Sequence, residues 1–473
     1  MNEKRETLGS RLGFILISAG CAIGVGNVWK FPTITGQNGG GFFVLFYLLF
    51  LIIMGIPVMT MEFSMGRAAK RSPVGIYPAL LPERKGGVFR PHGYVCLAGN
   101  VLLMMFYTSV TAWMLRYFLY MVSGKFNGMD KAAAQGVFGE MLGEPLTMVL
   151  LVALVVALGF FVCSFNMQKG LERVSKYMML ALLAIMVVLA VNAFTMDGAK
   201  EGLSFYLLPS VEKLLDPAHN GILGVIVAAM NQAFFTLSIG MGSMAIFGSF
   251  IGKDRALMGE SVRIAALDTF VAFTAGLIIF PACFTYGVEV TAGPSLIFEA
   301  LPFVFQNMWL GGVWGALFFV FLSFAALSTV FAVFQNILSC TEELFGWSKK
   351  KACLIDGIAL FLLALPCVLG FLLPDGAISL GSLASVLDIE DYLVSNIVLP
   401  LGSLIFVLFC TQRAGWGFDN FMAEANTGKG LKLAKWMYGY MKYVLPVFIG
   451  VILVISIVSP FVNVEKLIFD LFR

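Results

Sequence analysis

Charged residues are scarce in this sequence of 473 residues. Asp, Glu, Lys and Arg make up 12% of the chain and apolar residues 59%, whereas a soluble domain is about 25% charged. The chain therefore lacks the polar surface of a soluble globule, and a net charge of +3 gives no basic face for nucleic acid. These absences exclude a soluble enzyme, a disordered chain and a nucleic-acid-binding protein. They leave a helical membrane protein, because a backbone within a bilayer must satisfy its own hydrogen bonds.

Histidine is almost absent, and cysteine shows no metal-binding pattern. The two histidines, His92 and His219, are expected in loops, and none of the eight cysteines forms a CxxC pair. A metalloprotease of the HExxH type would have no ligands here. The cysteines are expected to be small buried side chains rather than disulfides or metal ligands. With no nucleophile–base set visible, the sequence predicts that the chain is not an enzyme and carries no organic cofactor.

Long apolar runs are abundant instead. A helix needs about 20 residues to cross a bilayer, and eleven runs predict an all-α membrane protein with eleven transmembrane helices. The runs lie at 12–36, 41–68, 92–123, 146–165, 174–195, 221–250, 258–285, 312–345, 353–373, 387–411 and 439–459. With the N-terminus cytoplasmic, 23 Lys and Arg residues fall on the cytoplasmic side and six on the other. This asymmetry predicts a plasma-membrane protein with its N-terminus in the cytoplasm and its C-terminus outside.

Closely spaced glycines interrupt the first and the sixth run, at Gly24 and Gly26 and at Gly240 and Gly242. Such glycines weaken a helix and let its backbone face a cavity; close helix packing through small residues is the alternative. The two sites stand about half the chain apart. This spacing predicts two inverted five-helix repeats with helices 1 and 6 unwound at mid-membrane. The repeats would occupy 1–200 and 201–420, and an eleventh helix and tail would occupy 421–473.

Ionisable residues within the runs need a reason, because a charge at mid-helix costs about 2.5–3.5 kcal/mol on insertion scales. Asp268 has no basic neighbour in the sequence, which favours a cation partner, whereas Glu62 can also bond a backbone group or a helix end. Lys30 and Asp391 have opposite charge at the same expected depth, so they predict either an outer ion pair or two solvated groups. The hydroxyl pair at 328–329 can bond its own helix or contribute oxygens to a small cation.

Several motifs match one family. They are RLGF at 11–14, GVGNVWKFP at 24–32, NGGG at 38–41, GIP at 55–57, QAFFTLS at 232–238 and the hydroxyl pair at 328–329. With these motifs the chain resembles the neurotransmitter:sodium symporter family, in its bacterial amino-acid-transporting branch with the leucine-transporter-type fold. The resemblance runs through nearly the whole chain. It implies two inverted five-helix repeats and uptake of a solute coupled to sodium by alternating access.

The resemblance implies two sodium sites. The first would use Ala22, Asn27, Thr236 and Asp268. The second would use the carbonyls of Gly20, Ile23 and Ala325 with the hydroxyls of Ser328 and Thr329. Because the substrate carboxylate would complete the first site, sodium and substrate would bind in contact with each other.

The resemblance also implies a substrate site. The substrate's charged groups would meet the backbone near Ala22, Val25, Gly26, Phe235 and Thr236 and the hydroxyl of Tyr107. The side-chain pocket would consist of Leu103, Phe235, Ser238, Met241, Thr329 and Val333. No charge lines this set, so desolvation excludes charged side chains, and the flexible Met241 suits large ones. We expect hydrophobic L-amino acids, aromatic ones included, as substrates.

Two gates follow from the same resemblance. Lys30 and Asp391 would close the outer side, and Arg5 and Glu343 the inner side. Lys30 stands where the family usually has Arg, and a lysine cannot form a bidentate fork with a carboxylate. Chloride-dependent relatives have neutral residues around the position of Asp268. A carboxylate at this position therefore predicts uptake that needs sodium but not chloride.

Two alternatives remain open. A proton-coupled amino-acid or amine permease of the same broad fold would keep the broken helices without the second sodium site. A membrane sensor would use the same binding site without turnover. The expected partners are an amino acid, sodium ions and the lipid bilayer, with no nucleic acid, and the sequence makes no prediction of the oligomeric state.

Overall fold

The computed structural model describes residues 9–215, 221–290, 296–374, 377–459 and 461, which are nearly all helical. Within these residues no β-strand occurs, and the only β-type pairs are two isolated bridges, Arg255–Lys429 and Leu380–Leu383. The predicted all-α class therefore holds for the described part of the chain. All eight cysteines lie within it as free thiols, seven of them buried.

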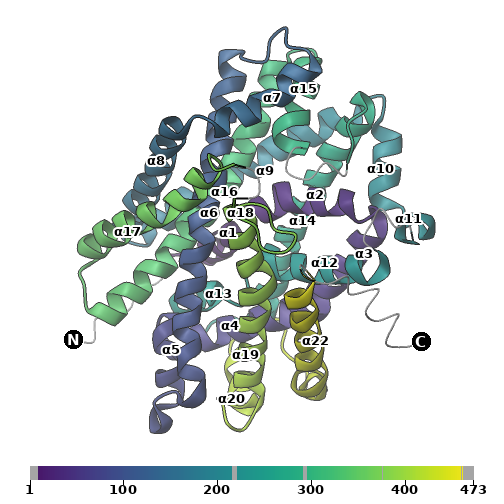
Figure 1. Ribbon diagram of the computed structural model, residues 1–473. Coiled ribbons are helices and arrows are strands. Elements are labelled where there is room, and N and C mark those ends of the chain that lie inside the picture. Colours follow the sequence, from purple (N-terminus) through teal and green to yellow (C-terminus); the bar gives the residue numbers. More distant parts are fainter. Residues whose placement is uncertain (1–8, 216–220, 291–295, 375–376, 460, 462–473) are drawn as a thin grey trace.

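The α-helices follow one another with short connections (Figure 1). They are α1 (Arg11–Ala22), α2 (Phe31–Gln37), α3 (Gly41–Phe50), α4 (Ile56–Ala69), α5 (Pro73–Leu80), α6 (Arg90–Ser123), α7 (Lys131–Leu142), α8 (Pro145–Ser164), α9 (Arg173–Phe194), α10 (Ala199–Leu207), α11 (Val211–Leu215), α12 (Gly221–Thr236), α13 (Ser243–Phe250), α14 (Leu257–Tyr286), α15 (Leu301–Gln306), α16 (Gly311–Phe345), α17 (Lys349–Gly370), α18 (Val386–Tyr392), α19 (Leu399–Thr411), α20 (Phe418–Ala425), α21 (Met437–Gly439) and α22 (Leu445–Val458). Short π-helical turns join some of them into longer helices; one such turn, Leu51–Gly55, links α3 to α4.

Nine helices of the described residues are long and apolar enough to cross a membrane. They are Gly41–Ala69, Gly87–Ser123, Pro145–Ser164, Gly170–Phe194, Leu257–Tyr286, Gly311–Phe345, Lys349–Gly370, Val386–Thr411 and Met437–Val458. A tenth span is formed if Arg11–Ala22 and Gly26–Gln37, which are bent by 54°, count as one. Ten of the eleven predicted runs thus correspond to helical segments of the required length and composition.

The sixth predicted run, 221–250, is not one helix. It is divided into α12 and α13, and the six residues between them follow a non-helical path. Ser238, Gly240 and Gly242 have φ values of +50°, +99° and +72°. Positive φ cannot continue a right-handed helix and is tolerated best by glycine, so the backbone of this segment ends α12.

Helix α16 lies at the centre of the molecule and packs against α1, α6, α8 and α9 (Figure 1). It is the most deeply buried of the candidate spans among the described residues. Helices α4 and α13 also approach each other closely: a Cβ at Gly66 would lie 1.8 Å from the Ala245 oxygen, and one at Gly248 would lie 2.4 Å from the Phe63 oxygen. Glycine is needed at both positions to bring the two backbones into contact.

Peripheral helices present apolar side chains outward. On α8, large exposed hydrophobic residues recur at helical spacing: Leu146, Leu150, Leu154, Leu158 and Phe161. A stripe of this kind faces lipid in a membrane protein, because water would not favour it. Among the shorter helices, α7 and α15 lie at one end of the molecule and α5 and α20 at the opposite end (Figure 1).

Candidate functional site

The two interrupted segments lie against each other. Helix α1 ends at Ala22, and the chain resumes a helical path at Gly26. The Gln232 side-chain amide donates to the Gly26 carbonyl at 2.7 Å, and the Ser238 hydroxyl donates to the Cys21 carbonyl at 3.1 Å. The Ser238 hydroxyl thus satisfies a carbonyl that the end of α1 leaves without a helical partner. Gln232 adds a second donor to the Gly26 carbonyl, which also accepts the Phe31 amide.

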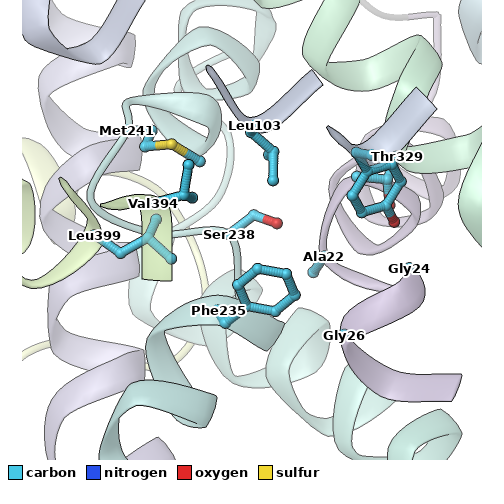
Figure 2. A pocket seen from close by; sticks show the side chains of 11 residues that line it. Ala22, Gly24, Gly26, Leu103, Phe235, Ser238, Met241, Thr329, Val394 and Leu399 are labelled. Carbon is cyan, nitrogen blue, oxygen red and sulfur yellow. The ribbon is translucent and has the colours of Figure 1, made fainter. Parts of the chain in front are cut away.

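A cavity opens where these two segments meet (Figure 2). It is lined by Ala22, Gly24, Gly26, Leu103, Tyr107, Phe235, Ser238, Met241, Thr329, Val394 and Leu399. Figure 2 shows Met241, Val394 and Leu399 on one side and Gly24 with Thr329 on the other. One end of the cavity is therefore apolar, whereas the other carries backbone groups and a hydroxyl.

Eight of the eleven residues predicted to bind substrate line this cavity, and three do not. The Val25 amide donates to the Tyr107 hydroxyl at 2.8 Å, directly beside the lining. Thr236 turns toward Asp268 instead, and Val333 is buried on α16 one turn beyond Thr329. The residues predicted to bind substrate did not include Gly24, Val394 and Leu399. Gly24 was expected only to interrupt the first helix, and the other two lie in an apolar run where cavity-facing and packed residues look alike.

The side chains assigned to the first sodium site converge on Asp268, which is fully buried. The Asn27 amide donates to the Asp268 carboxylate at 2.8 Å and to its main-chain carbonyl at 3.1 Å. The Thr236 hydroxyl donates to the second carboxylate oxygen at 3.2 Å. Ala22 lines the adjacent cavity. Asn27, Thr236 and Asp268 therefore form one hydrogen-bonded group around an acid, and their sequence neighbours Gly26 and Phe235 line the cavity together with Ala22.

The residues assigned to the second sodium site lie between α1 and α16. The Thr329 hydroxyl is 3.3 Å from each of the carbonyl oxygens of Gly20, Cys21 and Ile23. The Ser328 hydroxyl is 3.3 Å from the Ile23 oxygen and 2.8 Å from the Ala325 oxygen. A hydroxyl has one proton to donate, so Thr329 cannot satisfy three carbonyls at once. The surplus oxygens fit a small cation, which binds oxygen ligands.

Lys30 and Asp391 form an ion pair beside the cavity. The Lys30 ammonium lies 2.7 Å from both carboxylate oxygens and 2.9 Å from the Ser395 hydroxyl. It also lies 4.1 Å from the centre of the Phe235 ring, which is a cation–π contact. Both charged side chains are about one quarter exposed. The pair joins the helix after the first interruption to α18 above the Phe235 ring.

At the opposite end of the molecule, Glu343 accepts bonds from the Ser72 amide at 2.8 Å and hydroxyl at 2.7 Å and lies 3.6 Å from Arg71. Arg5, its expected partner, lies outside the described residues. Glu343 therefore links the end of α16 to the start of α5.

Glu62 and His92 flank the second interruption. A Glu62 oxygen accepts the Gly240 amide at 2.5 Å. This acid therefore bonds a backbone group, which is one of the roles that the sequence allows for it. The expectation that His92 lies in a loop was wrong: it lies in α6, and it is buried against Tyr77 and Phe406. Aromatic side chains from distant elements cover it, which the sequence around it does not reveal. His219 lies outside the described residues.

Comparison with known proteins gives consistent matches along the chain. A sequence profile described as the sodium:neurotransmitter symporter family matches residues 5–128 and 138–469. The uncharacterized sodium-dependent transporter YhdH of Bacillus subtilis is 30% identical over 453 residues, which cover 95% of this chain and 97% of that protein. The sodium- and chloride-dependent GABA transporter 2 of Bos taurus is 26% identical over 469 residues, which cover 88% and 75%.

The fold is also similar to a solved one. The crystal structure of MhsT in complex with L-phenylalanine matches with a TM-score of 0.85 and 34% sequence identity. The match covers 97% of this chain and 100% of that one.

Proposed function

Because the chain belongs to the sodium:neurotransmitter symporter family, we propose that it takes up hydrophobic L-amino acids, aromatic ones included, together with sodium by alternating access. Membership makes it an integral membrane protein and a sodium-dependent transporter rather than an enzyme. The substrate class, the sodium sites, the anion requirement and the topology are the parts that we propose. The observation that carries the proposal is the cavity with one polar and one apolar end.

The polarity of the cavity supports an amino-acid substrate. At the polar end, backbone near Gly24 and Gly26 and the Tyr107 hydroxyl would hold the charged groups. At the apolar end, Met241 and Leu399 would surround the side chain. None of the lining residues is charged, so an acidic or basic side chain would lose its hydration without gaining a partner. The bound L-phenylalanine of MhsT fits this class of substrate.

Sodium would bind in two places. In the second site, Ser328 and Thr329 would hold the ion together with carbonyls of the first interrupted segment. In the first site, Asn27, Thr236 and Asp268 would hold the ion next to the substrate carboxylate. An ion in contact with both the protein and the substrate favours joint binding, and this contact would couple the two fluxes. No organic cofactor is required by this scheme.

Asp268 supports transport without chloride. Its carboxylate brings a fixed negative charge to the first site, where a bound anion would otherwise balance sodium. A second negative charge nearby would be repelled in this low-dielectric setting. We therefore expect chloride to be dispensable, unlike in the chloride-dependent relative.

The proposed topology has eleven crossings. The split run at 221–250 would complete the count, and the two interruptions would lie near mid-membrane in the first helices of two inverted repeats, at 1–200 and 201–420. The eleventh helix and tail would occupy 421–473. Helices α5 and α20, which belong to segments rich in Lys and Arg, lie at the same end of the molecule (Figure 1). This arrangement supports a cytoplasmic N-terminus and, with eleven crossings, an outer C-terminus.

Alternating access would use contacts on both sides of the cavity. The Lys30–Asp391 pair would close the outer path above Phe235 and would have to open to admit substrate. On the inner side, Glu343 would act together with Arg5. Release to the cytoplasm would require these inner contacts to separate while the outer pair stays closed.

Uptake by purified protein in proteoliposomes tests the proposal. An inward sodium gradient should drive accumulation of a labelled hydrophobic amino acid, and competition by all twenty amino acids should rank hydrophobic ones first. Accumulation in sodium-free, potassium-matched medium with a proton gradient would instead identify a proton-coupled permease. Binding without accumulation would identify a sensor. A charged or very small preferred substrate would contradict the argument from the cavity.

A further inference from the structure

Helix α6 carries a polar face that substrate binding does not account for. His92, Cys96 and Asn100 follow one another at intervals of four, so they share one face of the helix. All three side chains are buried. This face lies against residues 240–243, the second half of the interruption between α12 and α13.

Asn100 makes the most complete set of contacts. Its amide donates to the Cys96 carbonyl of its own helix at 2.7 Å and to the Met241 carbonyl at 2.9 Å. Its side-chain oxygen accepts from the Ser243 hydroxyl at 3.3 Å. The Met241 carbonyl belongs to a segment that no helix continues, so a donor from α6 takes the place of a helical partner.

The residues before Asn100 hold the neighbouring peptide. The Cys96 sulfur lies 4.0 Å from the Gly240 carbonyl oxygen. Gly402 also lies against this carbonyl. A Cβ at Gly402 would stand 1.8 Å from the Gly240 oxygen and 3.0 Å from the His92 Nε2 atom. The Gly240 amide belongs to the preceding peptide, and Glu62 accepts it. Successive peptides of the interruption are therefore held from two helices, α4 and α6.

The same turn of α6 makes room for the Met241 side chain. A Cβ at Gly99 would lie 3.2 Å from the Met241 sulfur, so glycine allows the thioether to lie against the helix. Met241 lines the apolar end of the cavity. Methionine has three rotatable bonds and adapts to its surroundings, so the position of its side chain depends on where its main chain is anchored.

We propose that Asn100 is a positioning residue that sets substrate selectivity by anchoring Met241. The inference rests on the proposed function of the cavity as the substrate site. With the Met241 carbonyl fixed, the side chain defines how much space a large substrate side chain finds. Without the anchor, the segment 240–242 shifts, the thioether samples the cavity, and the distinction between large and small side chains weakens.

Selectivity is measured as the ratio of KM for L-alanine to KM for L-phenylalanine in proteoliposomes. Asn100→Leu, similar in size but without donors, should lower this ratio about tenfold, the change expected from one buried hydrogen bond, with kcat within about twofold. Asn100→Gln keeps the amide but displaces it and should give a smaller loss. Ser243→Ala removes only the contact to the side-chain oxygen and is the matched control; it should keep the wild-type ratio. An unchanged ratio in both Asn100 variants would overturn the proposal.

A double-mutant cycle separates positioning from general damage. In a Met241→Ala background, Asn100→Leu should change the ratio little, because alanine leaves no long side chain at position 241 for the main-chain anchor to place in the cavity. Equal effects in both backgrounds would mean that Asn100 does not act through Met241, and they would refute the inference.

A readout that needs no transport distinguishes failure of this inference from failure of the proposed function. Amide hydrogen exchange of purified full-length protein should become faster at residues 237–243 in Asn100→Leu or Asn100→Gln, but not in Ser243→Ala, while α16 keeps its protection. Wild-type protein that transports neither amino acid would refute the proposed function, and the exchange data would still decide whether Asn100 holds the segment. Unchanged exchange in both Asn100 variants would reject the anchor.

Discussion

The side-chain amide of Asn27 donates to Asp268 twice, at 2.8 Å to the carboxylate and at 3.1 Å to the main-chain carbonyl. Thr236 donates to the remaining carboxylate oxygen. Among the described residues, neither Lys nor Arg forms an ion pair with this fully buried acid. Neutral donors stabilise the carboxylate, but they do not cancel its charge. A cation at this site would do so, and this reasoning leads to the first prediction.

Asp268→Asn should raise the sodium concentration for half-maximal uptake about tenfold or more, or should make uptake depend on chloride. The substitution removes the charge and keeps the size of the side chain, and bonds to charged groups are worth about 1.5–3 kcal/mol. Sodium titrations of proteoliposome uptake in chloride and in gluconate measure both effects. Wild-type protein should be equally active in the two media.

Asp356 provides the control for this substitution. It is another buried aspartate, but it lies on α17 and accepts the Thr341 hydroxyl at 2.6 Å. Asp356→Asn should leave both the sodium dependence and the insensitivity to chloride as in the wild type. If Asp268→Asn behaved in the same way as this control, Asp268 would not belong to the first sodium site.

Replacing the hydroxyl pair of α16 should weaken sodium binding at the second site. Ser328→Ala and Thr329→Val each remove an oxygen that faces the carbonyls of Gly20 or Ile23, and sodium would lose a ligand without a change in fold. For each variant, the sodium concentration that gives half of the maximal thermal stabilisation should rise about tenfold. Thermal unfolding of purified protein at increasing sodium concentration measures this value. Ser323→Ala is the matched control on the same helix, because its hydroxyl bonds only its own helix at Phe319. Equal responses of Ser323→Ala and Ser328→Ala would argue against the site.

The sequence predicts the helices well because a bilayer imposes their length. The run predicted at 312–345 is observed at Gly311–Phe345, and the run predicted at 41–68 at Gly41–Ala69. The run at 221–250 is apolar throughout, so hydropathy joins what the backbone divides. The glycines of this run do indicate the interruption. A residue without a Cβ adopts positive φ readily, as Gly240 and Gly242 do.

The site is less accessible to sequence reasoning. Most of the lining residues came from the resemblance to a family and not from composition or spacing. Val394 and Leu399 could not be found, since facing a cavity and facing a neighbouring helix require the same apolar side chain. Asn100 could not be found either. Its role depends on the Met241 carbonyl, which is 141 positions away in the chain and becomes available only because α12 has ended.

Breaking the Lys30–Asp391 pair should impair closure of the outer side. Lys30→Gln removes the charge and shortens the side chain, so the closed form should lose about 1 kcal/mol, as for a partly exposed ion pair. Uptake at subsaturating substrate should fall several-fold, whereas Lys30→Arg should preserve it. Lys125→Gln is the control, because Lys125 pairs with the exposed Glu140 at 3.5 Å and neither residue lines the cavity. Wild-type uptake by Lys30→Gln would show that the pair does not contribute to closure.

A methyl group at Gly24 should block the polar end of the cavity. A Cβ at this position would lie 2.2 Å from the Tyr107 hydroxyl and 2.4 Å from the Thr329 hydroxyl, both of which line the cavity. Crowding of this kind costs about 1–3 kcal/mol in a packed interior, so Gly24→Ala should bind labelled L-phenylalanine about tenfold to a hundredfold more weakly. Equilibrium binding to purified protein at saturating sodium measures the change.

The matched control for Gly24→Ala lies on α7, where a Cβ at Gly139 would meet nothing within 4 Å. Gly139→Ala should bind substrate normally and should gain slightly in thermal stability, because alanine favours a helix over glycine by about 1 kcal/mol. If Gly24→Ala instead kept wild-type affinity, substrate could not occupy the space between Tyr107 and Thr329. The polar end of the cavity would then have to lie elsewhere, and the orientation proposed for the amino acid would be wrong.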